Sequence, residues 1–99
     1  MTEIVKVFTG ADIHDGTRLH RGSVLAQMQD GSRRILDPLE VPQGTPVAGL
    51  ERGVLCPGFI DLQVNGGGGV MFNDRPDVAT LRRIARAHRG TGVAGFLPT

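Results

Sequence analysis

The sequence predicts an α/β chain in which a β-rich segment, residues 1–55, precedes a single strand–helix–strand unit. Short runs of β-branched and other apolar residues, separated by Gly and Pro turns, fill the first half. In the second half, apolar runs at 59–64 and 93–97 flank a segment whose apolar residues recur every three or four positions. A strand, a helix and a second strand in this order form the building block of parallel α/β folds.

The segment 1–55 is expected to form a small, mostly antiparallel β unit. Residues 4–8 and 23–28 are apolar runs that end at turn sequences. The second run is followed by Gln-Asp-Gly-Ser, which favours a hairpin because Gly accepts the positive φ that tight turns require. Ile35 begins the returning strand, and the prolines within 37–46 favour an extended connection after it.

The segment that follows is expected to form the βαβ unit. Residues 59–64 are almost continuously apolar, which suits a strand covered on both faces. After four glycines, a helix is expected with Pro76 in its first turn and Asp74 as its N-cap. Gly90 ends the helix, and 93–97 form the second strand. The apolar face of the helix consists of Val78, Leu81, Ile84, Ala85 and His88.

Composition excludes several classes of function. The 99 residues are 39% hydrophobic and 21% charged, and the net charge of +1 comes from interspersed residues, so no nucleic-acid partner is expected. No apolar stretch approaches the roughly 20 residues that span a bilayer, and no signal peptide is visible, so the protein is expected to be cytoplasmic without a membrane partner.

The single cysteine, Cys56, is expected to be a small buried hydrophobe. His14 and His20 have no ligand spacing.

The most specific pattern lies at residues 57–66, Pro-Gly-Phe-Ile-Asp-Leu-Gln-Val-Asn-Gly. This block resembles the first barrel strand of the amidohydrolase superfamily, where many members have Pro-Gly-Phe-Ile-Asp-x-His-x-His. Gln63 and Asn65 stand where the two histidines would be. That departure, together with Phe-Asn-Asp at 72–74 and Gly-Phe-Leu-Pro-Thr at 95–99, resembles the N-acetylglucosamine-6-phosphate deacetylase family within that superfamily.

The resemblance implies a more specific fold. Residues 1–55 would be the N-terminal part of a β-sandwich domain, and residues 56–99 the first βαβ unit of a TIM-like (β/α)8 barrel, truncated. Such a barrel typically needs about 250 residues, and a second strand at the chain end would leave an open apolar edge. The chain is therefore expected to be an N-terminal fragment. The alternative is a complete small α+β domain that dimerises to cover this edge.

The resemblance also implies an active site. Side chains two residues apart on a strand point to the same side, so Gln63 and Asn65 are expected to line the site at the barrel mouth, with Gly66 and Gly67. Carboxamides are poor ligands for transition metals but good hydrogen bonders. One divalent metal ion, zinc or iron, would be held by a glutamate and two histidines beyond Thr99. An aspartate further on would be the general base, so no catalytic residue and no metal ligand is expected within the chain.

Simpler roles remain open for several of these residues. Asn65 before a glycine is a common turn signal. The run Gly66–Gly69 could cradle a phosphate, although a role in shaping the barrel mouth is favoured because no Lys-Ser/Thr pair follows it. Asp61 is expected to make a buried structural hydrogen bond rather than to act in catalysis.

By the same resemblance, the reaction is hydrolysis of the acetamido group of N-acetylglucosamine 6-phosphate to glucosamine 6-phosphate and acetate, in amino-sugar catabolism. The partners would be this small amino-sugar phosphate and, at full length, a second copy in a homodimer. The 99-residue chain alone is expected to be inactive. Two alternatives remain: another hydrolase of the amidohydrolase superfamily, disfavoured by the missing histidine pair, and a non-catalytic, truncated β-rich module.

Overall fold

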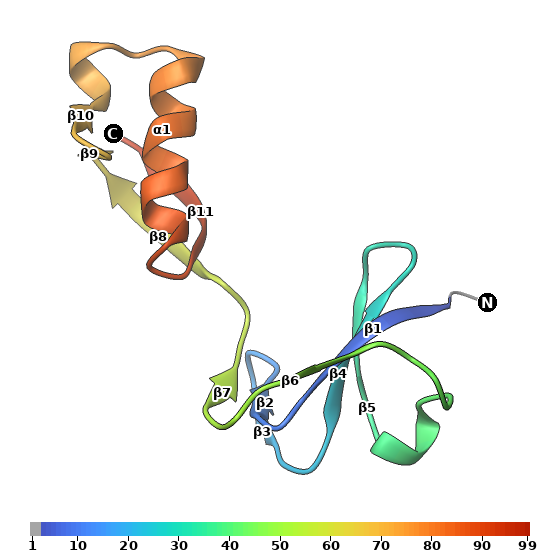
Figure 1. Ribbon diagram of the computed structural model, residues 1–99. Helices are drawn as coiled ribbons and strands as arrows, with labels where there is room; N and C mark the ends of the chain where they lie inside the picture. The colour runs from blue at the N-terminus through green and yellow to red at the C-terminus, as the bar shows by residue number, and fades with distance from the viewer. Residues whose placement is uncertain (1–2) are drawn as a thin grey trace. The chain divides into compact units, whose positions relative to one another are not determined.

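The computed structural model describes residues 3–99, which fall into two compact units, Met1–Pro57 and Gly58–Thr99 (Figure 1). The first unit is built from short strands, and the second contains the α-helix of the described chain. The chain is thus a mixed α/β structure of small sheets with one helix across residues 3–99. No helix in this part of the chain is long and apolar enough to cross a membrane.

The main sheet of the first unit has four strands in the order β5-β4-β1-β6. The β1–β4 and β4–β5 pairs are antiparallel, whereas β1 and β6 are parallel. Alternate side chains of β4 are buried, as expected for a strand with one covered face. The core of the sheet consists of Val7, Val24, Ala26 and Met28. The strands are β1 (Ile4–Thr9), β4 (Val24–Met28), β5 (Arg33–Leu36) and β6 (Val47–Gly49).

A second, three-stranded sheet has the order β3-β2-β7 and also contains a parallel pair, β2 with β7. The expectation of a mostly antiparallel unit is therefore right for the hairpins but misses both parallel pairs. Parallel partners need a long crossover rather than a tight turn, and no local turn sequence announces them. The elements are β2 (Asp12–His14), β3 (Leu19–His20), β7 (Val54–Leu55) and a 3-10 turn, η1 (Pro38–Glu40), inside the connection expected to be extended.

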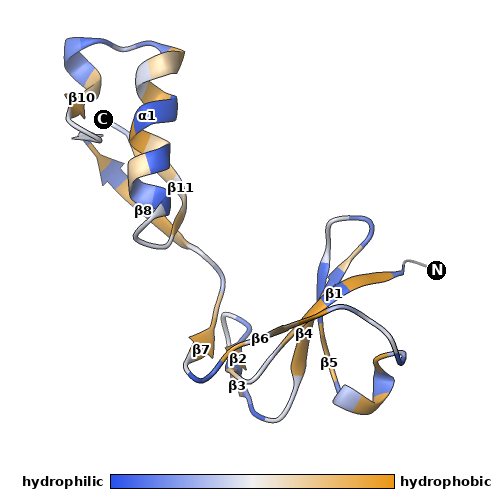
Figure 2. Ribbon diagram, in the orientation of Figure 1, coloured by the Kyte–Doolittle hydropathy of each residue, from blue (hydrophilic) through white to orange (hydrophobic). Residues whose placement is uncertain are grey.

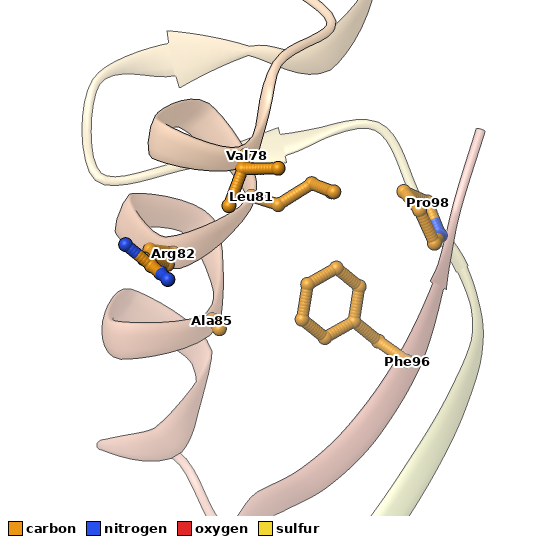
Figure 3. Close-up of a pocket in the computed structure, with 6 residues that line it drawn as sticks. All are labelled: Val78, Leu81, Arg82, Ala85, Phe96 and Pro98. Carbon is orange, nitrogen blue, oxygen red and sulfur yellow. The ribbon is translucent and has the colours of Figure 1, made fainter.

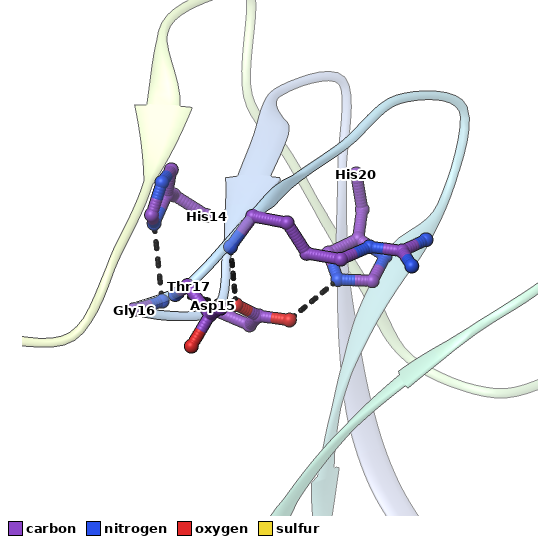
Figure 4. A network of polar contacts seen from close by, with 6 residues as sticks. His14, Asp15, Gly16, Thr17 and His20 are labelled. Carbon is purple, nitrogen blue, oxygen red and sulfur yellow. Dashed lines mark hydrogen bonds and ion pairs between the residues drawn. The ribbon is translucent and has the colours of Figure 1, made fainter.

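The loop between β2 and β3 is held by the Asp15 carboxylate (Figure 4). One carboxylate oxygen accepts from the backbone amides of Thr17 and Arg18 at 2.7 and 2.8 Å, and the other lies 2.8 Å from His20 Nε2. The contact with His20, followed by the Arg18 and Thr17 amides, holds the pKa of the Asp15 carboxyl well below its usual range. These contacts give His20 a role in the turn, and His14 Nδ1 likewise accepts from the amide of Gly16 at 3.0 Å.

The lowered pKa predicts a pH-dependent contribution of Asp15 to stability. Because the carboxylate is favoured in the folded state, its contribution is present above the unfolded-state pKa of about 3.9 and is lost as the pH falls below it. The difference in urea midpoint between the wild type and Asp15→Asn should therefore begin to shrink as the pH falls below about 5 and should go on shrinking below about pH 3. A difference that stayed constant over this range would contradict the assignment.

The second unit contains the predicted strand–helix–strand order. β8 and β11 pair in parallel, and α1 lies between them in the sequence and packs on β11 (Figure 1). The glycine run, expected to be a loop, instead forms a two-stranded antiparallel hairpin, β9 with β10. The elements are β8 (Phe59–Val64), β9 (Gly66–Gly67), β10 (Val70–Met71), a 3-10 turn η2 (Phe72–Asp74), α1 (Val78–Arg89) and β11 (Val93–Pro98).

The helix α1 begins one turn later than the sequence pattern suggested. Asp77, not Asp74, is its N-cap, because the Asp77 carboxylate accepts from the amide of Thr80 at 2.8 Å. This hydrogen bond also lowers the pKa of Asp77. Asp74 lies in η2, and Pro76 precedes the cap. Ile84 is fully buried on the predicted apolar face, and polar and apolar residues alternate along α1 in Figure 2.

The expectation that Cys56 is buried is wrong, since its side chain is exposed. Cys56 lies after β7 and before β8, in a stretch outside both strands, next to the boundary between the two units. A connecting segment at such a boundary packs against few neighbours, so its residue types say little about burial.

Candidate functional site

The predicted site residues lie at the carboxyl end of β8. Because β8 and β11 are parallel, their carboxyl ends share one edge of the sheet, and Pro98 is paired with Val64 there. The Thr99 amide donates to the Val64 carbonyl at 2.9 Å and extends this pairing by one residue. In barrels built from parallel strands, active sites are formed at this edge.

Asn65 is held by two hydrogen bonds from separate parts of the second unit. Its side-chain oxygen Oδ1 accepts from the Thr99 hydroxyl at 2.6 Å, and its carbonyl accepts from the Phe72 amide at 2.8 Å. A residue that only formed a turn would not need a side-chain bond to the neighbouring strand. The geometry therefore favours a defined orientation of the Asn65 carboxamide.

Gln63 precedes Asn65 by two positions, and its side chain is exposed. Its backbone amide donates to the Asp61 carboxylate at 3.1 Å. Asp61, which is half-buried, thus makes a local hydrogen bond within its own strand, but this bond is exposed and not the buried one that was expected. At this edge Gln63 offers a carboxamide to solvent, where a ligand can reach it.

Gly66 is packed too tightly against backbone to carry a side chain, and Gly67 lies against the tip of the His88 side chain. A Cβ at Gly66 would overlap the Val70 carbonyl oxygen, and one at Gly67 would lie 2.9 Å from His88 Nε2. The His88 Nε2–H group donates to the Gly66 carbonyl at 2.9 Å, which fixes the β9–β10 hairpin on α1. This packing explains why residue 66 is a glycine, and it places Gly67 beside α1.

A separate apolar hollow of about 310 Å³ lies between α1 and β11 (Figure 3). It is lined by Val78, Leu81, Arg82, Ala85, Phe96 and Pro98. None of the predicted site residues contributes to it, and Arg82 is its one charged residue. A ligand site usually combines an apolar wall with several convergent polar groups, so this hollow does not fit one.

Within residues 3–99, no group of three or more His, Cys, Asp or Glu side chains is placed to hold a metal ion. The carboxamides of Gln63 and Asn65 do not supply such a ligand set either. The described residues therefore do not fit a complete metal centre by themselves.

The residue patterns assigned no role to Thr99, and they gave His88 a place on the apolar helix face as a packed or cap-proximal residue. Thr99 bonds a residue 34 positions earlier, and His88 one 22 positions earlier. The strand register could have suggested the first contact, since Thr99 follows the strand that runs beside β8. Nothing in the sequence marks the second, because its acceptor is a backbone carbonyl.

No family model matches the chain, but curated relatives do. It is 56% identical over 50 residues to an N-acetylgalactosamine-6-phosphate deacetylase of Shewanella sp. (strain ANA-3), which involves 50% of the chain and 13% of the relative. It is 42% identical over 65 residues to the N-acetylglucosamine-6-phosphate deacetylase of Haemophilus influenzae (66% and 17%). Over 76 residues it is 37% identical to an N-acetylgalactosamine-6-phosphate deacetylase of Escherichia coli O157:H7 (74% and 18%).

A solved structure is similar over nearly the whole chain. The crystal structure of N-acetylglucosamine-6-phosphate deacetylase from Pasteurella multocida superimposes with a TM-score of 0.82 and 32% identity, covering 94% of the chain and 24% of that protein. The chain thus spans less than a quarter of each of these proteins.

Proposed function

We propose that the complete protein, to whose N-terminal part this chain corresponds, is an amidohydrolase of the N-acetylhexosamine-6-phosphate deacetylase family. It would hydrolyse the acetamido group of an N-acetylhexosamine 6-phosphate. The products are acetate and the free amino-sugar phosphate. The observation that supports the proposal is the β8 edge, where the Thr99 hydroxyl donates to Asn65 Oδ1. By resemblance, Gln63 and Asn65 stand there in place of the histidine pair of many amidohydrolases.

Two substrates are compatible with the relatives. N-acetylglucosamine 6-phosphate is the first candidate, because the block around β8 resembles that family and the Pasteurella protein of this name superimposes over 94% of the chain. N-acetylgalactosamine 6-phosphate is the second, because the Shewanella relative of that name is 56% identical over 50 residues. Assaying both sugars with the full-length protein distinguishes them.

The proposed architecture of the full-length protein is a β-sandwich domain joined to a TIM-like barrel. Residues 1–55 would contribute strands to the sandwich, and residues 56–99 the first βαβ unit of the barrel. The parallel pair β8–β11 with its helical crossover supports the second assignment. The mixed sheets of the first unit are compatible with the assignment of residues 1–55 to the sandwich.

Gln63, Asn65, Gly66 and Gly67 would line the substrate site at the barrel mouth. The two carboxamides would hydrogen-bond the substrate, and the two glycines would let the backbone turn closely beneath it. By family resemblance, one divalent ion, zinc or iron, would polarise the acetamido carbonyl. Its ligands and the general base would come from residues beyond Thr99, since residues 3–99 do not supply a ligand set.

The test uses the full-length protein with Gln63→Ala and Asn65→Ala. Each substitution removes a group that hydrogen-bonds substrate, so kcat/KM for the preferred sugar should fall by about 10- to 100-fold. Gln43→Ala, an exposed glutamine in the first unit, is the matched control and should leave kcat/KM unchanged. Metal content is measured in each variant. Unchanged turnover and metal content in both site variants would rule out the proposed site.

A further inference from the structure

Thr99 joins the carboxyl ends of β8 and β11 by two hydrogen bonds of different kinds. Its backbone amide donates to the Val64 carbonyl at 2.9 Å, as an ordinary continuation of the parallel ladder. Its hydroxyl donates to Asn65 Oδ1 at 2.6 Å, across 34 residues of sequence. The first bond is available to every residue type except proline, whereas the second needs a hydroxyl.

The backbone around Asn65 is fixed by other contacts. The Asn65 carbonyl accepts from the Phe72 amide at 2.8 Å, and the next carbonyl, of Gly66, accepts from His88 Nε2 at 2.9 Å. With the backbone held on this side, the remaining freedom lies in the side-chain torsions of Asn65. The hydrogen bond from the Thr99 hydroxyl restricts these torsions.

The direction of this bond decides which end of the carboxamide the site meets. A carboxamide has one acceptor oxygen and an NH2 group with two donors. Because Oδ1 accepts from Thr99, the oxygen is turned toward β11, and the NH2 group is the end that Asn65 can direct at a ligand. The site would then meet a donor at this position, matched to an oxygen of the substrate.

We propose that Thr99 is a positioning residue that orients the Asn65 carboxamide so that its NH2 group donates to an oxygen of the bound N-acetylhexosamine 6-phosphate. The inference rests on the proposed function for its substrate, and on the Thr99–Asn65 bond for its geometry. Thr99 touches no reacting atom and acts only through Asn65.

The test is a double-mutant cycle in the full-length protein. Thr99→Val keeps the shape and the backbone bond to Val64 but removes the hydroxyl, and should lower kcat/KM about tenfold. Thr99→Ser restores the hydroxyl and should remain within about twofold of the wild type. In an Asn65→Ala background, Thr99→Val should cause no further loss, because the group it orients is already absent.

A role of Thr99 in strand packing alone gives a different pattern. It would produce the same loss in the wild-type and Asn65→Ala backgrounds, and that result overturns the proposal. An unchanged kcat/KM in Thr99→Val overturns it as well.

A spectroscopic measurement separates this inference from the proposed function. In full-length protein labelled with 15N-asparagine, the Asn65 side-chain NH2 resonances should shift in Thr99→Val and stay near their wild-type positions in Thr99→Ser. Inactivity of the wild type toward both sugars would reject the proposed function and, with it, the named substrate. The NMR comparison would still decide whether Thr99 orients Asn65, because unchanged resonances in Thr99→Val overturn that step.

Discussion

Replacing Gly10 with alanine should lower the free energy of unfolding of the Met1–Pro57 unit by about 3 kcal/mol or more. Gly10 follows β1 with a φ of 90°, which L-residues rarely adopt. A Cβ there would also overlap the Leu50 carbonyl oxygen, a backbone atom that cannot rotate aside. The Leu50 amide donates to the Thr9 carbonyl at 2.8 Å, so relieving the overlap would disrupt the end of the β1–β6 pair.

Gly49→Ala is the matched control for this substitution. Gly49 pairs with Thr9 in the same parallel ladder, but a Cβ there meets no atom within 4 Å and its φ is not positive. Its stability should therefore stay within about 0.5 kcal/mol of the wild type or rise slightly. Urea denaturation followed by circular dichroism measures both variants. Equal midpoints for Gly10→Ala and Gly49→Ala would contradict the close approach of Gly10 to Leu50.

Local sequence patterns were sufficient for the elements stabilised by contacts close in sequence. The period of α1 places Ile84 on the buried face, and the Gln-Asp-Gly-Ser turn joins β4 to β5, where the Gly31 amide donates to the Met28 carbonyl at 3.0 Å. The turn contact joins residues three positions apart, and the buried face of α1 follows from the spacing of its own residues. Propensity and periodicity report such contacts directly.

Contacts between distant segments were not predictable in the same way. β1 pairs with β6 although about forty residues separate them, and neither strand carries a signal that names its partner. The β9–β10 hairpin was missed for another reason, because two of its four residues are glycines without side chains to show an alternating pattern. The Asp77 cap was missed because Pro76 was expected in the first turn of the helix, which placed the cap before it, at Asp74, whereas the helix begins at Val78.

For the candidate site, the two-residue period of a strand was enough to place Gln63 and Asn65 near the end of β8. The orientation of Asn65 required the register of β11, which brings Thr99 beside it. The hydrogen bond from His88 to Gly66 required the docking of α1 on the hairpin. The sequence thus locates the carboxamides, and tertiary contacts determine how they are held.

Those tertiary contacts make Gly66→Ala the most damaging substitution expected at the site. A Cβ at Gly66 would overlap the Val70 carbonyl oxygen and lie 3.0 Å from the Met71 Cα, so the β9–β10 hairpin has to open. Opening it moves Gly66, which directly follows Asn65 and whose carbonyl accepts the hydrogen bond from His88. Displacing a substrate-positioning group by about 1 Å can cost 100-fold in rate, so kcat/KM of the full-length protein should fall by about 100-fold or more.

Gly90→Ala separates this effect from the general cost of replacing a glycine in the same unit. Gly90 caps α1 with a φ of −63°, and a Cβ there has its nearest neighbour, the Ala87 carbonyl oxygen, at 3.6 Å. Its kcat/KM should stay within about twofold of the wild type, with equal or slightly higher thermal stability. If Gly66→Ala were as active as Gly90→Ala, the hairpin would not shape the site. The orientation of Asn65 would then depend on Thr99 without support from the glycine turn.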